Sequence, residues 1–243
     1  TATVGGLNDA HISKLTTDQV VGLTTDQVKA LQSGQLTAMT SDQLVAMTTE
    51  QLGEMSGTQL SGIETADLVN LSTDQIKSLA SGSVSGMSTA QINKLTTAQF
   101  SALTTDQVQK LTTSQVVALS TAQAAKLSAE QITAMSTAQV AALETADLEA
   151  LNGDAIEAMS AAQVKALTAA QFSKLKTSQL RRIGTEQFAA VATDRIAAMS
   201  SDQLASLTTA QAQVMSTAQV AALSSTQIPK LSASVMATFN SMQ

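Results

Sequence analysis

The chain has 243 residues, of which 44% are hydrophobic, and carries a net charge of −6 with only 13% charged residues. It contains no Cys, which excludes a disulfide framework and thiol chemistry. The acidic balance and the low charge density give no electrostatic footprint for nucleic acid, and no apolar run approaches the roughly 18 residues of a membrane span, so we predict neither nucleic-acid binding nor membrane insertion.

A large apolar residue returns every eight residues from Leu7 to Phe239 without insertion or deletion. We divide residues 8–239 into 29 octads, numbered from Asn8, and number the positions within each octad as slots one to eight. A period this strict indicates a repeat array rather than a domain with one globular core. We therefore predict a single continuous array over residues 1–243. Because both ends lie within the eight-residue register, we interpret the chain as a fragment of a longer protein with flanking modules outside it.

Every octad carries signals for the start of a short helix. Slot one is Ser, Thr or Asn in 22 of the 29 octads, slot four is Gln in 22, and slot five is always apolar. Ser or Thr followed three residues later by Gln is a capping box, and the preceding slot eight and slot five form a hydrophobic staple. Acidic residues at slot three, such as Asp18 and Asp106, favour the positive end of the helix dipole. The pattern predicts one helix of about six or seven residues per octad.

Helices this short are unstable alone, so they must pack on their neighbours. We predict an all-α fold without β-sheet, an α-solenoid or superhelix of very short capped helices, with slots five and eight lining an apolar interior. A continuous helix is excluded because eight residues overshoot two turns by about 80°, and coiled coils need a period near 3.5 or 3.67. A β-solenoid remains an alternative, although slots five and eight would fall on opposite faces of a strand.

Several octads depart from the pattern. His11 stands in slot four of the first octad without an evident partner, so we interpret it as a polar substitute for Gln. Two octads open with Glu-Thr-Ala-Asp at Glu64 and Glu144, and there we expect the cap to move to Thr65 and Thr145. The Gly-rich stretches at 53–62 and 82–86 are interpreted as softened places in the spiral. Proline within a helix removes a backbone donor, so the helix around Pro229 should be shortened.

Charged residues gather in two stretches of the second half. Calcium binding by the acidic one is an alternative, but its spacing matches neither EF-hand nor RTX patterns, and we interpret both stretches as solvated surface. The basic stretch has a second interpretation, contact with an acidic partner or with the acidic stretch of another copy. The acidic residues are Glu144, Asp147, Glu149, Asp154 and Glu157, and the basic ones are Lys174, Lys176, Arg181, Arg182 and Arg195.

Octads of the LTTxQVxAL type, such as residues 111–119, cover essentially the whole chain. In repeat style they resemble the Thr/Gln/Ala-rich octapeptide-repeat regions of large bacterial surface or secreted adhesin-like proteins. The resemblance implies an extracellular or cell-surface location in a bacterium and a stalk or display role.

The sequence contains no nucleophile–base pair, ligand cluster or phosphate loop, so we predict no enzyme, no catalytic, cofactor-binding or metal-binding residues, and no cofactor. We expect a structural repeat scaffold acting as a spacer, stalk or display segment. The alternative is a solenoid that binds a protein or peptide through slots three and six. A further alternative is an ice-binding surface formed by rows of Thr at slots one and two, although capping already uses the slot-one hydroxyls. The partners that we expect for the repeat array are flanking modules of the parent protein, an unknown protein or another copy of the chain.

Overall fold

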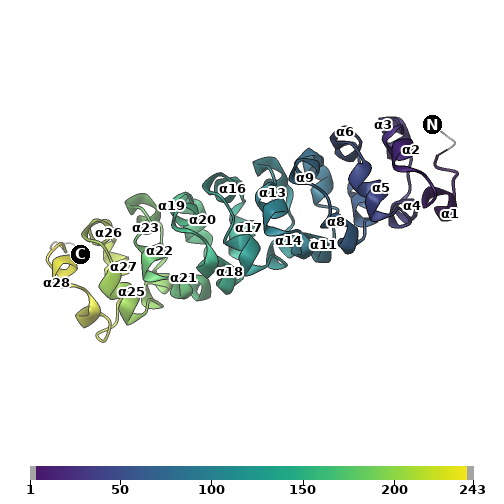
Figure 1. Ribbon diagram of the computed structural model, residues 1–243. Coiled ribbons are helices and arrows are strands. Elements are labelled where there is room, and N and C mark those ends of the chain that lie inside the picture. Colours follow the sequence, from purple (N-terminus) through teal and green to yellow (C-terminus); the bar gives the residue numbers. More distant parts are fainter. Residues whose placement is uncertain (1–3, 240–243) are drawn as a thin grey trace. The chain divides into compact units, whose positions relative to one another are not determined.

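The computed structural model describes residues 4–239 (Figure 1). This range forms 28 α-helices and one 3₁₀ helix, η1, and contains no strand. The prediction of an all-α array of very short helices is confirmed. The chain divides into two compact units, Thr1–Gln123 and Ala124–Gln243, which are described separately below.

From α1 to α27, the number of each helix is also the number of its octad. The first fourteen helices are α1 (Asp9–Ile12), α2 (Thr17–Val21), α3 (Thr25–Lys29), α4 (Ser33–Thr37), α5 (Ser41–Ala46), α6 (Thr49–Gly53), α7 (Gly57–Ser61), α8 (Thr65–Leu68), α9 (Thr73–Ser78), α10 (Ser81–Val84), α11 (Thr89–Lys94), α12 (Thr97–Ser101), α13 (Thr105–Lys110) and α14 (Thr113–Val117). The remaining ones are α15 (Thr121–Ala124), α16 (Ala129–Ala134), α17 (Thr137–Ala142), α18 (Thr145–Ala150), α19 (Gly153–Glu157), α20 (Ala161–Ala166), α21 (Ala169–Lys174), α22 (Thr177–Leu180), α23 (Thr185–Ala189), α24 (Thr193–Ala197), α25 (Ser201–Ser206), α26 (Thr209–Gln213), α27 (Thr217–Ala221), η1 (Ile228–Lys230) and α28 (Ala233–Met236).

The helices have four to six residues, so the expected length of six or seven was too long. Octad 2 shows why. After α2, the N–H of Leu23 donates to the carbonyl of Val20 at 3.1 Å, a tight bond between residues three apart. The next residue, Thr24, is extended with ψ 158° and caps the following helix. The closing turn at Leu23 and the extended cap at Thr24 therefore end α2 before it can reach six or seven residues.

In the first unit, the helices from α1 to α11 each pack on the helix three octads further along. The pairs α2 with α5, α7 with α10 and α10 with α13 show this spacing. Side-chain hydrogen bonds, described below, link octads that are four apart. One turn of the solenoid therefore takes between three and four octads, a value that the sequence did not supply.

The second unit repeats this arrangement. Its contacting pairs include α17 with α20, α18 with α21 and α20 with α23. Each unit is thus wound by the same rule, which is the solenoid packing expected from the octad period.

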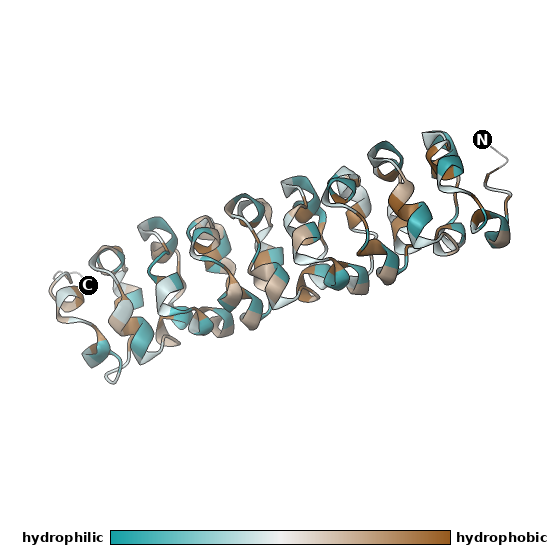
Figure 2. Cartoon of the chain, viewed as in Figure 1, coloured by the Kyte–Doolittle hydropathy of each residue, from teal (hydrophilic) through white to brown (hydrophobic). Residues whose placement is uncertain are grey.

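Slots five and eight line the interior of both units, as predicted. Val20, Leu44 and Phe100 at slot five are completely buried, and Leu103 at slot eight is 4% exposed. Figure 2 shows hydrophobic and hydrophilic residues mixed along the short helices, as expected for helices that bury one side. Most of the slot-four Gln side chains are also buried, for example Gln107. The interior is therefore more polar than the sequence suggested.

The two Glu-Thr-Ala-Asp octads keep the register of the others, so the expected shift of the cap was wrong. Glu64 and Glu144 remain the N-cap residues, and their side chains make no capping hydrogen bond. Leu68 at slot five of octad 8 is buried like its counterparts. A cap moved by one residue would rotate that side chain out of the interior, so the apolar register determines where the helix begins.

The Gly-rich octads and Pro229 have clear structural consequences. A Cβ on Gly86 would overlap the backbone of Gly57, and a Cβ on Gly57 would lie 3.0 Å from the Cα of Gly86. These two glycines permit close packing of backbones from neighbouring turns, so we replace the interpretation as softened places with a packing role. Around Pro229 the α-helix is replaced by the short 3₁₀ helix η1, which confirms the expected shortening.

Candidate functional site: the glutamine ladder

The side-chain carbonyl of slot-four Gln completes the capping box of its own octad. In octad 13, the N–H of Thr104 donates to Gln107 Oε1 at 2.8 Å. The N–H of Gln107 donates in return to Thr104 Oγ1 at 3.2 Å. The same pair of bonds recurs in octad 21 between Thr168 and Gln171. The predicted capping boxes are therefore present, and they use only the oxygen of each carboxamide.

The nitrogen of the same carboxamide reaches the octad four positions earlier. Gln107 Nε2 donates to the carbonyl oxygens of Ile76 at 2.9 Å and Leu79 at 2.7 Å. These are slots five and eight, at the end of a helix, where carbonyls lack the full set of helical hydrogen bonds. The Ile76 carbonyl also accepts from the N–H of Leu79 at 3.3 Å. A single side chain thus satisfies the start of one helix and the end of another, one solenoid turn away.

This double bonding recurs along both units, and we name the set of residues the glutamine ladder. Its members in the first unit are Gln35, Gln43, Gln51, Gln59, Gln75, Gln91, Gln99, Gln107, Gln115 and Gln123. Its members in the second unit are Gln163, Gln171, Gln179, Gln187, Gln203, Gln211, Gln219 and Gln227.

The ladder explains a choice that the capping box alone does not. A capping box accepts Glu as readily as Gln, yet slot four never contains Glu in this chain. Only a carboxamide combines an acceptor for the cap with donors for the distant carbonyls. The absence of Glu was the one signal in the sequence that pointed to the second set of bonds.

Where slot four is not Gln, two octads supply the missing donor in another way. Octad 19 has Ala155 at slot four, and Asn152 at slot one takes over both tasks. Its Oδ1 accepts from the N–H of Ala155 at 2.8 Å, and its Nδ2 donates to the carbonyl of Leu127 at 3.0 Å. In octad 24, Arg195 Nε donates to the carbonyl of Leu167 at 2.9 Å. The helix-end carbonyl is satisfied in both cases.

The two slot-four aspartates differ in their surroundings. Asp67 is half-buried and accepts a hydrogen bond from the hydroxyl of Ser41. Asp147 is 2% exposed, and its Oδ2 has no hydrogen-bond partner. Burial raises the pKa of Asp147 to about 6, and the charge of Glu144 adds to this effect. The expectation that the whole acidic stretch is solvated was wrong for Asp147, because slot four faces the interior.

The basic stretch pairs in part with the acidic stretch of the same chain. Arg182 Nη1 lies 2.6 Å from Glu157 Oε2 and 3.5 Å from Asp154 Oδ1, which joins octads 19 and 22. These groups are largely exposed, so the pair contributes little to stability. Lys174, Lys176 and Arg181 are exposed, as expected.

The isolated His11 is exposed at slot four of octad 1, and the N–H of its backbone donates to the Asn8 side chain at 3.0 Å. In residues 4–239 no group of three or more His, Asp or Glu side chains is placed to hold a metal ion. None of the helices in this range is both long and apolar enough to cross a bilayer.

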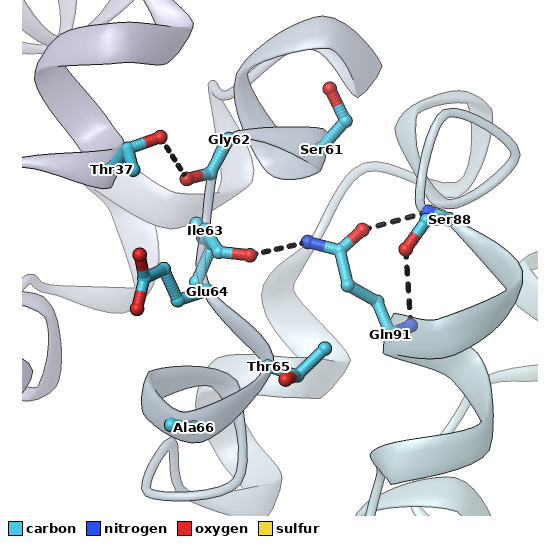
Figure 3. A pocket seen from close by; sticks show the side chains of 9 residues that line it. All are labelled: Thr37, Ser61, Gly62, Ile63, Glu64, Thr65, Ala66, Ser88 and Gln91. Carbon is cyan, nitrogen blue, oxygen red and sulfur yellow. Dashed lines mark hydrogen bonds between the residues drawn. The ribbon is translucent and has the colours of Figure 1, made fainter.

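A shallow pocket of the first unit lies beside the start of α8 (Figure 3). Gln91 Nε2 donates to the carbonyl of Ile63 at 2.7 Å, and Thr37 Oγ1 donates to the carbonyl of Gly62 at 2.8 Å. Ladder and packing hydrogen bonds thus use these two polar side chains of the wall. The only charged side chain that lines the pocket is that of Glu64, so we assign no chemistry to it.

A family model described as the ALTTAQ repeat matches residues 25–57, 60–97, 80–113, 113–145, 140–177 and 196–233. These segments cover well over half of the chain. The chain belongs to the ALTTAQ repeat family. A comparison with curated proteins found no significant match.

The ALTTAQ pattern corresponds to slots seven and eight of one octad followed by slots one to four of the next. Residues 102–107 read Ala-Leu-Thr-Thr-Asp-Gln. The pattern therefore ends on the ladder Gln. Between the last two matches, residues 178–195 contain the capping position Gly184 and the substituted slot four, Arg195.

Proposed function

We propose that this ALTTAQ repeat array is a non-enzymatic structural scaffold that sets distance within a larger protein, as a spacer, stalk or display segment. The observation that carries the proposal is the glutamine ladder. The side-chain amides of its residues donate hydrogen bonds that join one turn to the next, as Gln107 does with Ile76 and Leu79. A repeat whose recurring polar residue is buried and committed in this way is suited to a structural role.

We further propose that the parent protein is a bacterial surface or secreted protein of the adhesin-like kind, located outside the cell. The support is the resemblance in repeat style noted above. Detection of the parent protein by antibody on intact cells, before and after surface proteolysis, tests the location. Signal lost on proteolysis is the expected result, and a signal that appears only after cell lysis contradicts it.

A change in array length tests the scaffold role directly. Residues 88–119 are four octads, about one turn, and a variant that carries them twice in succession preserves the register. Small-angle X-ray scattering should show a longer maximum dimension with an unchanged cross-section. A matched insertion of the same number of Gly and Ser residues forms a flexible coil. Its scattering profile should instead show the features of a flexible chain and no constant cross-section. A radius of gyration near the globular value of about 18 Å for this chain length would contradict the spacer role.

The alternative of a binding module needs a continuous exposed stripe at slots three and six. Three slot-six valines of the first unit are exposed, Val21 at 46%, Val45 at 42% and Val117 at 46%. Between Val45 and Val117, at the same spacing of three octads, stand Val69, which is half-buried, and Asn93. The stripe is interrupted, so the scaffold is the function we propose.

A further inference from the structure

Asp147 is the buried carboxyl group that neither the capping boxes nor the ladder accounts for. It stands at slot four of octad 18 with 2% of its surface exposed, and its Oδ2 has no hydrogen-bond partner. Its counterpart two octads later, Gln163, donates from Nε2 to Ile132 at 2.7 Å and Met135 at 2.7 Å. A charged carboxylate has no proton to donate, whereas a protonated one has a single O–H donor.

The helix that carries Asp147 is joined to two octads that lie about one turn later in the second unit. Helix α18 packs on α21. Gln179 of octad 22 donates to the carbonyls of Leu148 and Leu151 at 3.0 and 2.9 Å, and both residues follow Asp147 in octad 18. A change in the charge of the Asp147 carboxyl group can therefore displace α18 and weaken the hydrogen bonds that Gln179 donates to octad 18.

Among residues 4–239, no ion pair compensates the charge of Asp147. Octad 17 has no charged residue, and octad 18 has two further acids. Arg182 is directed to the carboxylates of octad 19. The charged groups of octad 18, of the adjoining octad 19 and of octads 21 and 22, which contact octad 18, are Glu144 and Glu149 in octad 18, Asp154 and Glu157 in octad 19, Lys174 in octad 21, and Lys176, Arg181 and Arg182 in octad 22.

We propose that octad 18 is a pH-sensitive joint of the second unit. Its helix α18 stays packed while Asp147 is protonated, and octad 18 opens locally more often when Asp147 carries its charge. The charged form is disfavoured in this environment because a buried carboxylate with an unpartnered oxygen loses its hydration without replacement. The proposal does not depend on the scaffold function, because it concerns only the local stability of the array.

The direction of the pH effect follows from the pKa of Asp147, which burial raises from 3.8 to about 6. Because the folded pKa lies above the unfolded one, the folded state binds the proton more tightly. The stabilisation by that proton is complete below about pH 4 and is lost as the pH rises through about 6. Acidification should therefore tighten octad 18, whereas acid weakens most proteins.

Hydrogen–deuterium exchange of the full chain at pH 5 and pH 7.5, corrected for the intrinsic pH dependence of exchange, tests the proposal. Peptides from octads 18 and 22 should open at least about tenfold more often at pH 7.5 than at pH 5. The variant Asp147→Gln restores the ladder residue, so it should remove this difference and raise protection at pH 7.5. Equal protection of the wild-type chain at the two pH values, or a difference that persists in Asp147→Gln, would overturn the proposal.

Asp67→Gln is the matched control. It makes the same substitution at the same slot, but Asp67 is only half-buried and has the Ser41 hydroxyl as a partner. This variant should leave the pH dependence of octads 18 and 22 unchanged. Titration of the Asp147 side-chain carbonyl carbon by NMR gives a reading that requires no variant. A midpoint near pH 6 supports the joint, and one near 4 overturns it.

Discussion

Octads 11–14 of the first unit and octads 18 and 19 of the second solve the same structural problem differently. In the first region, the slot-four Gln of each of the four octads donates to carbonyls at the end of a helix four octads earlier. These residues are Gln91, Gln99, Gln107 and Gln115. In the second region slot four holds Asp147 and then Ala155. Octad 19 recovers the donor through Asn152, whereas octad 18 leaves an oxygen of Asp147 unpartnered. The comparison shows that the donor can be moved from slot four to slot one of an octad, and that octad 18 keeps its helix without the carboxamide donor.

Replacing one Gln of the glutamine ladder with Glu, which is a carboxylate at neutral pH, should have the largest effect on stability. Gln107→Glu keeps the acceptor for Thr104 and loses the donor to Ile76 and Leu79, so buried oxygens would face one another. We expect the free energy of unfolding to fall by about 3 kcal/mol at neutral pH, measured by denaturant titration.

Gln19→Glu is the control for this substitution. Gln19 is exposed in the first turn and has its capping bonds to Thr16. A change within about 0.5 kcal/mol is expected there. Equal losses at Gln107 and Gln19 would mean that the distant carbonyl bonds contribute nothing.

Octad 10 is a gap in the ladder within the first unit, with Ser83 at slot four, and its Gly86 packs closely on the backbone of Gly57. Gly86→Ala forces a methyl group into the Gly57 backbone and should reduce the free energy of unfolding by about 2 kcal/mol. Gly82→Ala meets nothing within 4 Å and should be neutral or slightly stabilising. Thermal unfolding of both variants separates packing from helix propensity, and equal midpoints would refute the packing role.

The relocated donor of octad 19 can be removed and then restored. Asn152→Ala deletes both the cap to Ala155 and the bond to Leu127, so we expect a loss of about 1.5 kcal/mol. The double variant Asn152→Ser with Ala155→Gln rebuilds the regular pattern and should recover that loss in denaturant titration. Failure of the double variant to recover stability would mean that the backbone of octad 19 has adapted to Asn152 alone.

The capping bond itself should give the smallest effect. Thr104→Ala removes the hydroxyl that accepts from Gln107 N–H and should cost about 1 kcal/mol. Thr105→Ala at the exposed slot two of the same octad is the control, with an expected change within about 0.5 kcal/mol. A loss at Thr105 as large as that at Thr104 would show that threonine matters here for a reason other than capping.

The sequence predicted the local part of this structure well. Capping, the staple and the interior slots depend on residues within one octad, so the spacing of Thr104, Gln107 and Val108 was sufficient. The partners of Gln107 Nε2 lie 28, 30 and 31 residues earlier. Identifying them requires the number of octads per turn, which depends on how slots five, seven and eight pack, and no single octad contains that information.

The same limit explains the failures at irregular octads. The burial of Asp147 follows from the inward direction of slot four, which the capping box did not reveal because an N3 side chain can cap from the surface. The caps at Glu64 and Glu144 stayed in place because the apolar residues of neighbouring turns determine the register. In each case a contact made a full turn away overrode a local preference.

Exchange of the Gln side-chain amide protons with water is the most direct test of the ladder. In a chain labelled with ¹⁵N at Gln, the Nε2 protons of buried ladder residues such as Gln107 should exchange slowly, because the side chain is buried and its Nε2 donates to backbone carbonyls. Those of the exposed Gln19 should exchange rapidly. Rapid exchange at Gln107 and at Gln19 alike would contradict the claim that slot-four carboxamides join successive turns.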